Sequence, residues 1–130
     1  GWKGPTTTSA DGYKQREELE FSVDDGDAVL LMLKKLGYTV VESIDRYVEV
    51  YDLDDTVVRM EWFPRMDVLV EIEGEPGGIE TAIAQLGIPR EHCVADSLAT
   101  FARRYGERTG QPALLAEEML QGEPPTWMAR

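Results

Sequence analysis

The feature that most constrains the fold is a short alternation of apolar and acidic residues, LVEIE, at positions 69–73. Successive side chains of a β-strand point to opposite faces of the sheet, so residues two apart share a face. The alternation predicts a strand that buries Val70 and Ile72 on one face and displays Glu71 and Glu73 on the other. Such a face needs an explanation beyond strand formation, because it sets two carboxylates side by side.

Charged residues share a strand face in other segments too. Residues 13–23 place Leu19, Phe21 and Val23 on one face, which predicts a half-buried strand with a charged second face. From strand parity, we predict that seven charged side chains converge on one concave sheet face: Arg16, Glu18, Arg46, Arg59, Glu61, Glu71 and Glu73.

The expected order of strands and helices gives an α+β fold. A turn at Asp52–Asp55 joins two strands into a hairpin, and hairpins dominate, so the sheet is expected to be mostly antiparallel. The expected helices cover about 27–36, the segment GGIETAIAQLG, a segment capped by Asp96, and about 114–120. Val68, Val70 and Ile72 are expected to pack beneath the helices that contain Leu31 and Ile83.

Composition argues against several classes of protein. The 130 residues carry a net charge of -12 and show no basic face, which argues against a nucleic-acid partner. No apolar run reaches membrane-spanning length, so no membrane association is expected. Cys93 is the only cysteine, which excludes an intrachain disulfide and favours a reducing, cytoplasmic setting.

The charged strand faces have two interpretations. Antiparallel sheets commonly pack one face on the core and expose the other to water, and a solvated face explains the pattern in that way. The mixture of acids and bases on strands with apolar opposite faces also suits a ligand that brings cations and phosphates. Carboxylates bind Mg²⁺ or Mn²⁺, and arginine and lysine bind phosphate oxygens.

Several segments together resemble the CYTH domain of the triphosphate tunnel metalloenzymes. These are WKGP, then KQREELEF, then a helix, and later VVRMEWFPRMDVLVEIEG followed by a helix ending in QLG. The resemblance runs from about Trp2 to Tyr105. It implies an antiparallel β tunnel, or part of one, with helices packed outside. The superfamily includes class IV adenylate cyclases, thiamine triphosphatases and inorganic triphosphatases.

The resemblance also implies roles for particular residues. Glu71 and Glu73 match the C-terminal metal-binding glutamates, so the strand would line a cation-filled tunnel. Arg46 and Glu61 would act in catalysis. The implied substrate-binding residues are Lys3, Arg16, Glu18 and Arg59.

The chain departs from the family pattern in three respects. Val48 lies where many members carry a second arginine, and Asp67 replaces a frequent glycine. The N-terminal Glu-x-Glu-x-Lys signature is absent. Residues 1–121 are therefore expected to form a CYTH-like domain without its first strands, followed by a loosely ordered tail at 122–130. An incomplete tunnel would leave strand edges unpaired, so a homo-oligomer formed through those edges is expected as one outcome.

The implied function is that of a metal-dependent phosphohydrolase or cyclase. Its substrate would be inorganic triphosphate, thiamine triphosphate or ATP, with Mg²⁺ or Mn²⁺ as cofactor. The missing signature strand and Val48 favour a second hypothesis, a non-catalytic module that binds phosphate or polyphosphate ligands. A third is a remnant with no ligand. The chain alone is expected to show little or no turnover.

Overall fold

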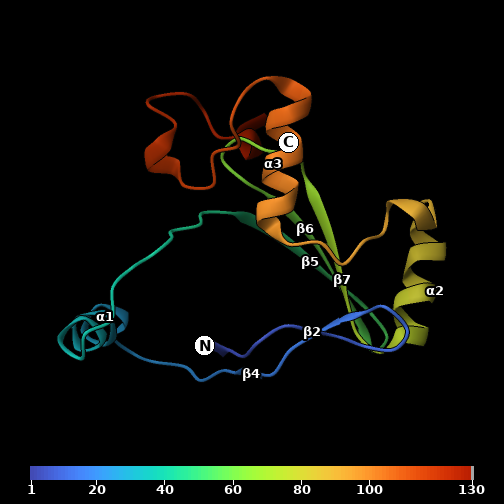
Figure 1. The fold of residues 1–130 in the computed structure, drawn as a ribbon, viewed down its shortest axis with the longest axis horizontal. Coiled ribbons are helices and arrows are strands. Elements are labelled where there is room, and N and C mark those ends of the chain that lie inside the picture. The colour runs from blue at the N-terminus through green and yellow to red at the C-terminus, as the bar shows by residue number, and fades with distance from the viewer. Residues whose placement is uncertain (130) are drawn as a thin grey trace. The chain divides into compact units, whose positions relative to one another are not determined.

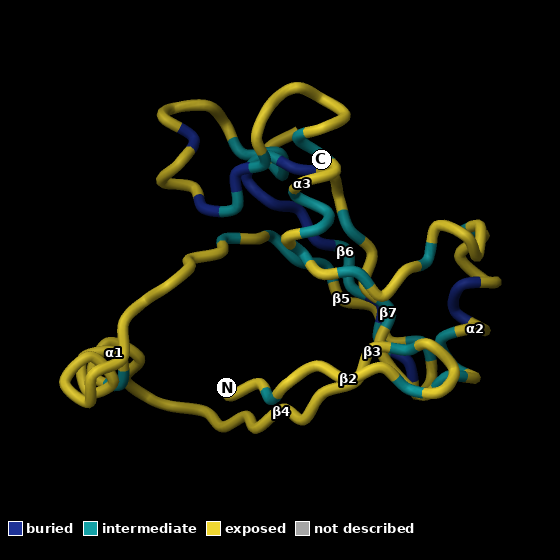
Figure 2. The backbone as a smooth tube through the Cα atoms, in the orientation of Figure 1, coloured by how far each residue is buried: buried dark blue, intermediate teal, exposed yellow. Residues whose placement is uncertain are grey.

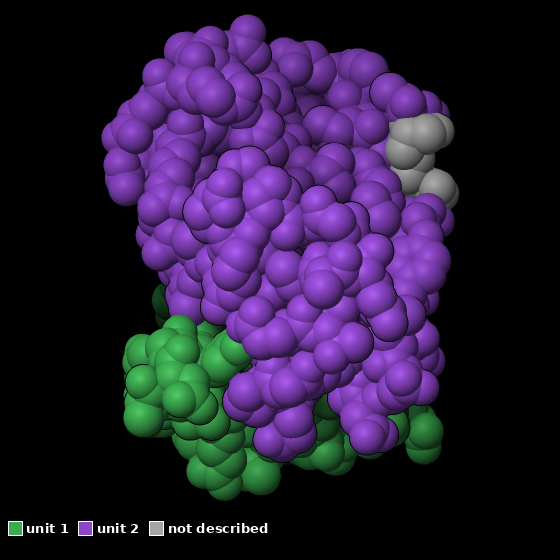
Figure 3. Space-filling view, turned by 90° about the vertical axis from the view of Figure 1, so that its right-hand side faces the viewer, with its two compact units in different colours: residues 1–42 green, residues 43–130 purple. Residues whose placement is uncertain are grey.

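The computed structural model describes residues 1–129, which divide into two compact units. The first is Gly1–Glu42 and the second is Ser43–Arg130 (Figure 3). The predicted α+β class is confirmed, because the described residues form three α-helices and small antiparallel sheets; no closed barrel is formed among them. None of the helices in residues 1–129 is long and apolar enough to cross a membrane.

The first unit consists of a two-stranded ribbon and one helix (Figure 1). In the ribbon, β1 pairs with β4 and β2 pairs with β3, all antiparallel. The helix α1 begins after Asp25, whose Oδ1 accepts a hydrogen bond from the Ala28 backbone N–H at 2.9 Å. The bounds are β1 (Trp2–Lys3), β2 (Thr7–Thr8), β3 (Lys14–Gln15), β4 (Glu18–Leu19) and α1 (Gly26–Lys35).

The half-buried strand predicted over 13–23 is not formed as such. Its strand residues are confined to β3 and β4, and Phe21 and Val23 lie outside any strand, exposed by 76% and 46%. Helix α1 contains no buried residue, and Figure 2 shows the first unit as almost entirely exposed. A two-stranded ribbon has no second layer within this unit to cover its apolar side chains, which explains why the alternation did not produce burial.

The second unit is built on a three-stranded antiparallel sheet in the order β5-β6-β7. The strands are β5 (Tyr47–Leu53), β6 (Thr56–Trp62) and β7 (Leu69–Glu73). The predicted hairpin between β5 and β6 is confirmed. Leu53 pairs with Thr56, which leaves a two-residue turn in which Asp54 adopts a left-handed φ of 54°.

Two α-helices and three 3₁₀ segments complete this unit. They are α2 (Pro76–Leu86), η1 (Arg90–His92), α3 (Leu98–Thr109), η2 (Glu117–Met119) and η3 (Thr126–Ala129). Gly87 and Gly110 end α2 and α3 in the left-handed conformation that glycine favours. The helix predicted at about 114–120 is wrong in extent, because only a 3₁₀ turn forms there.

Helix α2 lies on the apolar face of the sheet, beside the turn between β5 and β6 (Figure 1). The Thr56 side chain fixes this placement: a Cβ added to Gly78 would lie 2.1 Å from Thr56 Oγ1. Ile83 is buried in α2, but Leu31 in α1 is 56% exposed, and Val68 and Val70 are 43% and 42% exposed. The predicted packing of these two valines beneath helices is therefore wrong. Val70 pairs with Met60, four residues along β6 from Thr56, the residue that α2 contacts.

The core of the second unit continues past the other end of β6. Phe63 is 1% exposed and packs in a region that also buries Met66, Leu114, Ala116 and Leu120. Arg65 and Leu114 exchange two backbone hydrogen bonds, of 3.0 and 2.8 Å. Thr126, in the segment expected to be a loose tail, donates its hydroxyl to the Phe63 carbonyl oxygen at 2.6 Å. The C-terminal segment is therefore hydrogen-bonded to the end of β6.

Candidate functional site

The β6–β7 ladder brings charged residues of the two strands onto one face. Arg59 is directly opposite Glu71, Glu61 is opposite Leu69, and Glu73 is opposite Val57. Directly paired residues of a ladder point to the same side, so these four charged side chains share a face. Thr56, next to α2, has the opposite parity. Helix α2 and the charged side chains therefore occupy opposite faces of the sheet.

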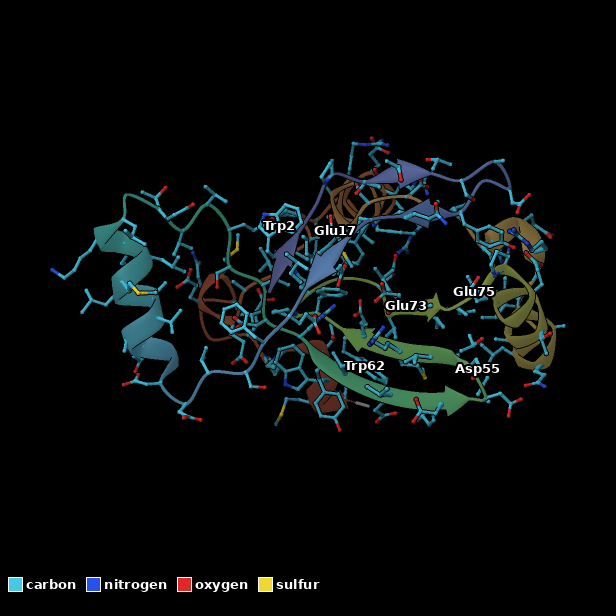
Figure 4. The ribbon with its side chains drawn as sticks, turned by 90° about the horizontal axis from the view of Figure 1, so that it is seen from below. Trp2, Glu17, Asp55, Trp62, Glu73 and Glu75 are labelled. Atoms are coloured by element: carbon cyan, nitrogen blue, oxygen red, sulfur yellow. The ribbon has the colours of Figure 1, made fainter. Side chains whose placement is uncertain are left out.

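Two ion pairs link the charged residues of this surface. Arg59 Nη1 contacts Glu73 Oε2 at 2.5 Å, diagonally across the ladder. Arg46, just before β5, forms an ion pair with Glu61. Figure 4 shows Glu73 at the α2 end of β7 and Trp62 at the opposite end of β6. We refer to Arg46, Arg59, Glu61, Glu71 and Glu73 together as the charged face.

Burial divides the carboxylates of the charged face into two kinds. Glu61 is only 5% exposed, and its pairing with Arg46 provides the partner that a buried charge requires. Glu71 is exposed and has no ion-pair partner among residues 1–129. The Glu73 side chain is 61% exposed although Arg59 holds it. Glu71 and Glu73 are thus the carboxylates of the charged face that a ligand can reach from solvent, and Glu61 holds the Arg46 guanidinium.

The environment of Arg59 stabilises the protonated, positively charged form of its guanidinium. Its hydrogen bond to Glu73 raises the pKa of the guanidinium above the ordinary value, and the charges of Glu73, Glu71 and Glu61 act in the same direction. Partial burial lowers the pKa and is second in size only to the hydrogen bond to Glu73, but the net shift is upward. Arg59 therefore stays charged at every accessible pH and can hold either a carboxylate or a phosphate oxygen.

The ribbon of the first unit carries a smaller charged cluster. Lys3 pairs with Glu18 in the ladder, and its Nζ lies 3.4 Å from Glu18 Oε1. Arg16 Nε donates to the same oxygen at 2.7 Å. The hydrogen bond from Arg16 lowers the pKa of the Glu18 carboxyl, and Lys3 adds to this effect. These three predicted residues do come together. Their convergence with residues of the second unit stays a prediction.

The strand β5 contributes differently from what the charge pattern suggested. Its side chains on the charged face are Val48, opposite Glu61, and Val50, opposite Arg59, followed by Asp52. The CYTH resemblance leads to a basic side chain at position 48, but the charged face carries the aliphatic side chain of Val48 there. Val50 could not be placed opposite Arg59 from the sequence alone, because that placement depends on the register between β5 and β6.

An ion pair between α3 and the segment before β7 was not predicted from the sequence. Arg108 on α3 contacts both carboxylate oxygens of Asp67, at 2.5 and 2.6 Å, just before β7. Asp67 departs from the CYTH pattern that the sequence resembles, and this bidentate pair gives it a structural role. It ties α3 to the segment that leads into β7. A spacing of 41 residues leaves no local signal from which it could be predicted.

The donor chemistry of the charged face suits a divalent cation only in part. Glu71 and Glu73 offer two carboxylates on one face, and Mg²⁺ is commonly held by one or two carboxylates together with waters and substrate phosphates. Among residues 1–129, no three His, Cys, Asp or Glu side chains gather into a group that would hold a metal ion. The two glutamates therefore fit a cation that arrives with a phosphate ligand.

The scan against protein-family models and the searches of curated proteins and solved structures found no match to this chain.

Proposed function

We propose that the charged face binds a triphosphate-bearing small molecule together with Mg²⁺ or Mn²⁺. The proposed reaction is hydrolysis of the triphosphate or cyclisation of ATP, as in the CYTH enzymes that the sequence resembles. The single observation that carries the proposal is the placement of Arg59 among Glu61, Glu71 and Glu73 on the sheet face opposite α2. Basic and acidic groups interleaved at strand spacing match a ligand that carries both phosphate and metal.

Each residue of the charged face has a separate role in this proposal. Glu71 and Glu73 hold the cation, and Arg59 holds phosphate oxygens. Glu61 is a positioning residue, because its buried carboxylate fixes the Arg46 guanidinium, and Arg46 contacts the phosphate that departs. The bound cation would neutralise charge on the phosphates. Within the first unit, Glu18 orients Lys3 and Arg16, the two basic residues to which the resemblance gives a phosphate-binding role.

The β tunnel itself is part of the proposal. Within residues 1–129, β5 and β7 are the outer strands of an open sheet, so the sheet would form one wall of such a tunnel. Pairing of an outer strand with a second copy of the chain is the proposed route to a homo-oligomer.

Titration calorimetry with sodium tripolyphosphate and MgCl₂ tests the proposed function. We expect the double variant E71Q/E73Q to weaken binding at least about tenfold, since even the residues that merely orient metal ligands contribute that much. The control E117Q/E118Q removes the same charge from an exposed segment of the same unit and should stay within about twofold. Equal losses in the two variants would mean that net charge, and not the charged face, determines binding.

A second candidate function, a non-catalytic module for phosphate ligands, is favoured by one observation. Val48 lies on the charged face, opposite Glu61, at the position where the CYTH resemblance leads to a basic side chain. Release of phosphate from tripolyphosphate and formation of cyclic AMP from ATP separate the candidates. Binding with turnover far below the ordinary enzyme range of about 1–10³ s⁻¹ supports the module, and turnover within that range supports the enzyme.

A further inference from the structure

The residue proposed to hold phosphate and one of those proposed to hold the cation neutralise each other in the free chain. Arg59 Nη1 lies 2.5 Å from Glu73 Oε2. Among the described residues, neither side chain forms an ion pair with any other residue. The Arg59 side chain is 30% exposed and that of Glu73 is 61% exposed, so both are reachable from solvent. A cation on Glu73 or a phosphate on Arg59 therefore competes with this ion pair for the same charged group.

We infer that the Arg59–Glu73 ion pair makes the binding of the cation and of the phosphate ligand mutually dependent. The inference rests on the proposed function and concerns how that same face is loaded. When the cation binds alone, Glu73 leaves Arg59 and the guanidinium loses its counter-ion. When the phosphate binds alone, Arg59 leaves Glu73 and the carboxylate loses its own. When both bind, each side chain exchanges one charged partner for another.

The neighbouring residues add to the same dependence. Glu71 is directly opposite Arg59 in the ladder and forms no ion pair of its own within residues 1–129, so a phosphate on Arg59 also approaches the Glu71 carboxylate. Phosphate without a cation would therefore meet two acidic groups. The ligand that the charged face selects is the complex of a divalent cation with a polyphosphate, and free polyphosphate is discriminated against.

Two single-ligand measurements test the exchange. The affinity for MnCl₂ alone is read from the electron paramagnetic resonance signal of free Mn²⁺ at 0.15 M KCl. The affinity for sodium tripolyphosphate alone is read by calorimetry in the presence of EDTA. We expect R59Q to raise the affinity for Mn²⁺, and E73Q to raise the affinity for tripolyphosphate in EDTA. Each gain should be about 2- to 5-fold, the contribution of an exposed ion pair.

A matched pair elsewhere in the unit controls for net charge. Arg103 and Glu107 form an exposed ion pair on α3, with side chains 60% and 61% exposed. R103Q changes the charge as R59Q does, and E107Q changes it as E73Q does. We expect both controls to leave the two affinities within about 1.5-fold of the wild type. Circular dichroism melts of all variants establish that the fold is retained, and R59K supplies a second variant that keeps the charge.

The double variant R59Q/E73Q separates exchange from simple repulsion. If Arg59 acts by holding Glu73, R59Q raises the Mn²⁺ affinity in the wild type but not in the E73Q background. If the gain is equally large in the E73Q background, Arg59 merely repels the cation and the inference is overturned. Absence of binding of the tripolyphosphate–Mg²⁺ complex to the wild type would instead overturn the proposed function. The two failures are therefore distinguishable.

Discussion

The two units of the chain start from similar strand patterns and reach different degrees of burial. In the first unit, Leu19 and Phe21 alternate with charged residues yet are 55% and 76% exposed. In the second unit, Val58 alternates with charged residues in the same way and is 2% exposed. The difference lies in what covers the strand. β6 is flanked by two strands and contacted by α2, whereas β4 has only one neighbour.

Alternation of apolar and charged residues identifies strands but does not by itself create a core. Among residues 1–129, all of the buried apolar side chains lie between Val58 and Leu120, within the second unit. A two-stranded ribbon is marginally stable in water, and at least three strands or a packed helix are needed for independent stability. The second unit meets that requirement, so we expect it to determine the stability of the chain.

The largest expected effect is the loss of a core aromatic side chain in the second unit. Phe63→Ala removes a side chain that is 1% exposed, and it should lower the free energy of unfolding by about 3–5 kcal/mol. Phe21→Ala is the matched change in the first unit, at 76% exposure, and should cost less than about 0.5 kcal/mol. Urea denaturation followed by tryptophan fluorescence measures both. A Phe21 variant as damaged as the Phe63 variant would refute the contrast between the units.

A smaller effect is expected where α2 meets the sheet. Gly78→Ala would place a methyl group 2.1 Å from the side-chain oxygen of buried Thr56, and we expect a loss of about 1–3 kcal/mol from this overpacking. Gly77 in the same helix has no neighbouring atom within 4 Å of an added Cβ. Gly77→Ala should therefore stabilise the chain by about 0.4–1 kcal/mol. Thermal melts of the two variants should shift in opposite directions; shifts of the same sign would argue that α2 does not contact Thr56.

The smallest expected effect concerns the ionisation of the ribbon in the first unit. The pKa of Glu18 is lowered from the ordinary value of 4.5, so the folded ribbon is favoured while Glu18 is ionised. That contribution is fully present above pH 4.5 and is lost as the pH falls through the lowered pKa. NMR titration of the Glu18 carboxyl should show the pKa rising in Arg16→Gln more than in Lys3→Gln, because Arg16 is the larger cause. Equal Glu18 pKa values in the wild type and in Arg16→Gln would show that the Arg16–Glu18 ion pair does not stabilise the ionised carboxylate.

Much of the second unit could be predicted from sequence because its signals are local. The alternation at 69–73 placed β7, the aspartates at 52–55 placed the hairpin turn, and Gly87 marked the end of α2. The helix expected at 114–120 failed for a non-local reason. Leu114 forms a backbone bridge to Arg65, and Asp45 accepts a hydrogen bond from the Glu117 backbone N–H at 2.8 Å, so that segment is held extended at its start.

The candidate site was predictable in composition but not in pairing. Strand parity sufficed to group Arg59, Glu61, Glu71 and Glu73 on one face. Which acid each arginine contacts depends on the register and on diagonal neighbours, and the Arg59–Glu73 pair is diagonal. Without the register, the sequence pointed to Glu73 as a metal ligand only, although Arg59 already holds it in the free chain.

An NMR titration of the ¹⁵N-labelled chain with sodium tripolyphosphate, in the presence of excess MgCl₂, tests directly the claim that the sheet face opposite α2 carries the ligand site. We predict that the largest chemical-shift changes occur at the Arg59 guanidinium and at the backbone amides of residues 59–61 and 71–73, with small changes in α3. Changes that are confined to α3, or that are absent at millimolar ligand, would contradict the claim and leave the charged face as a solvated surface.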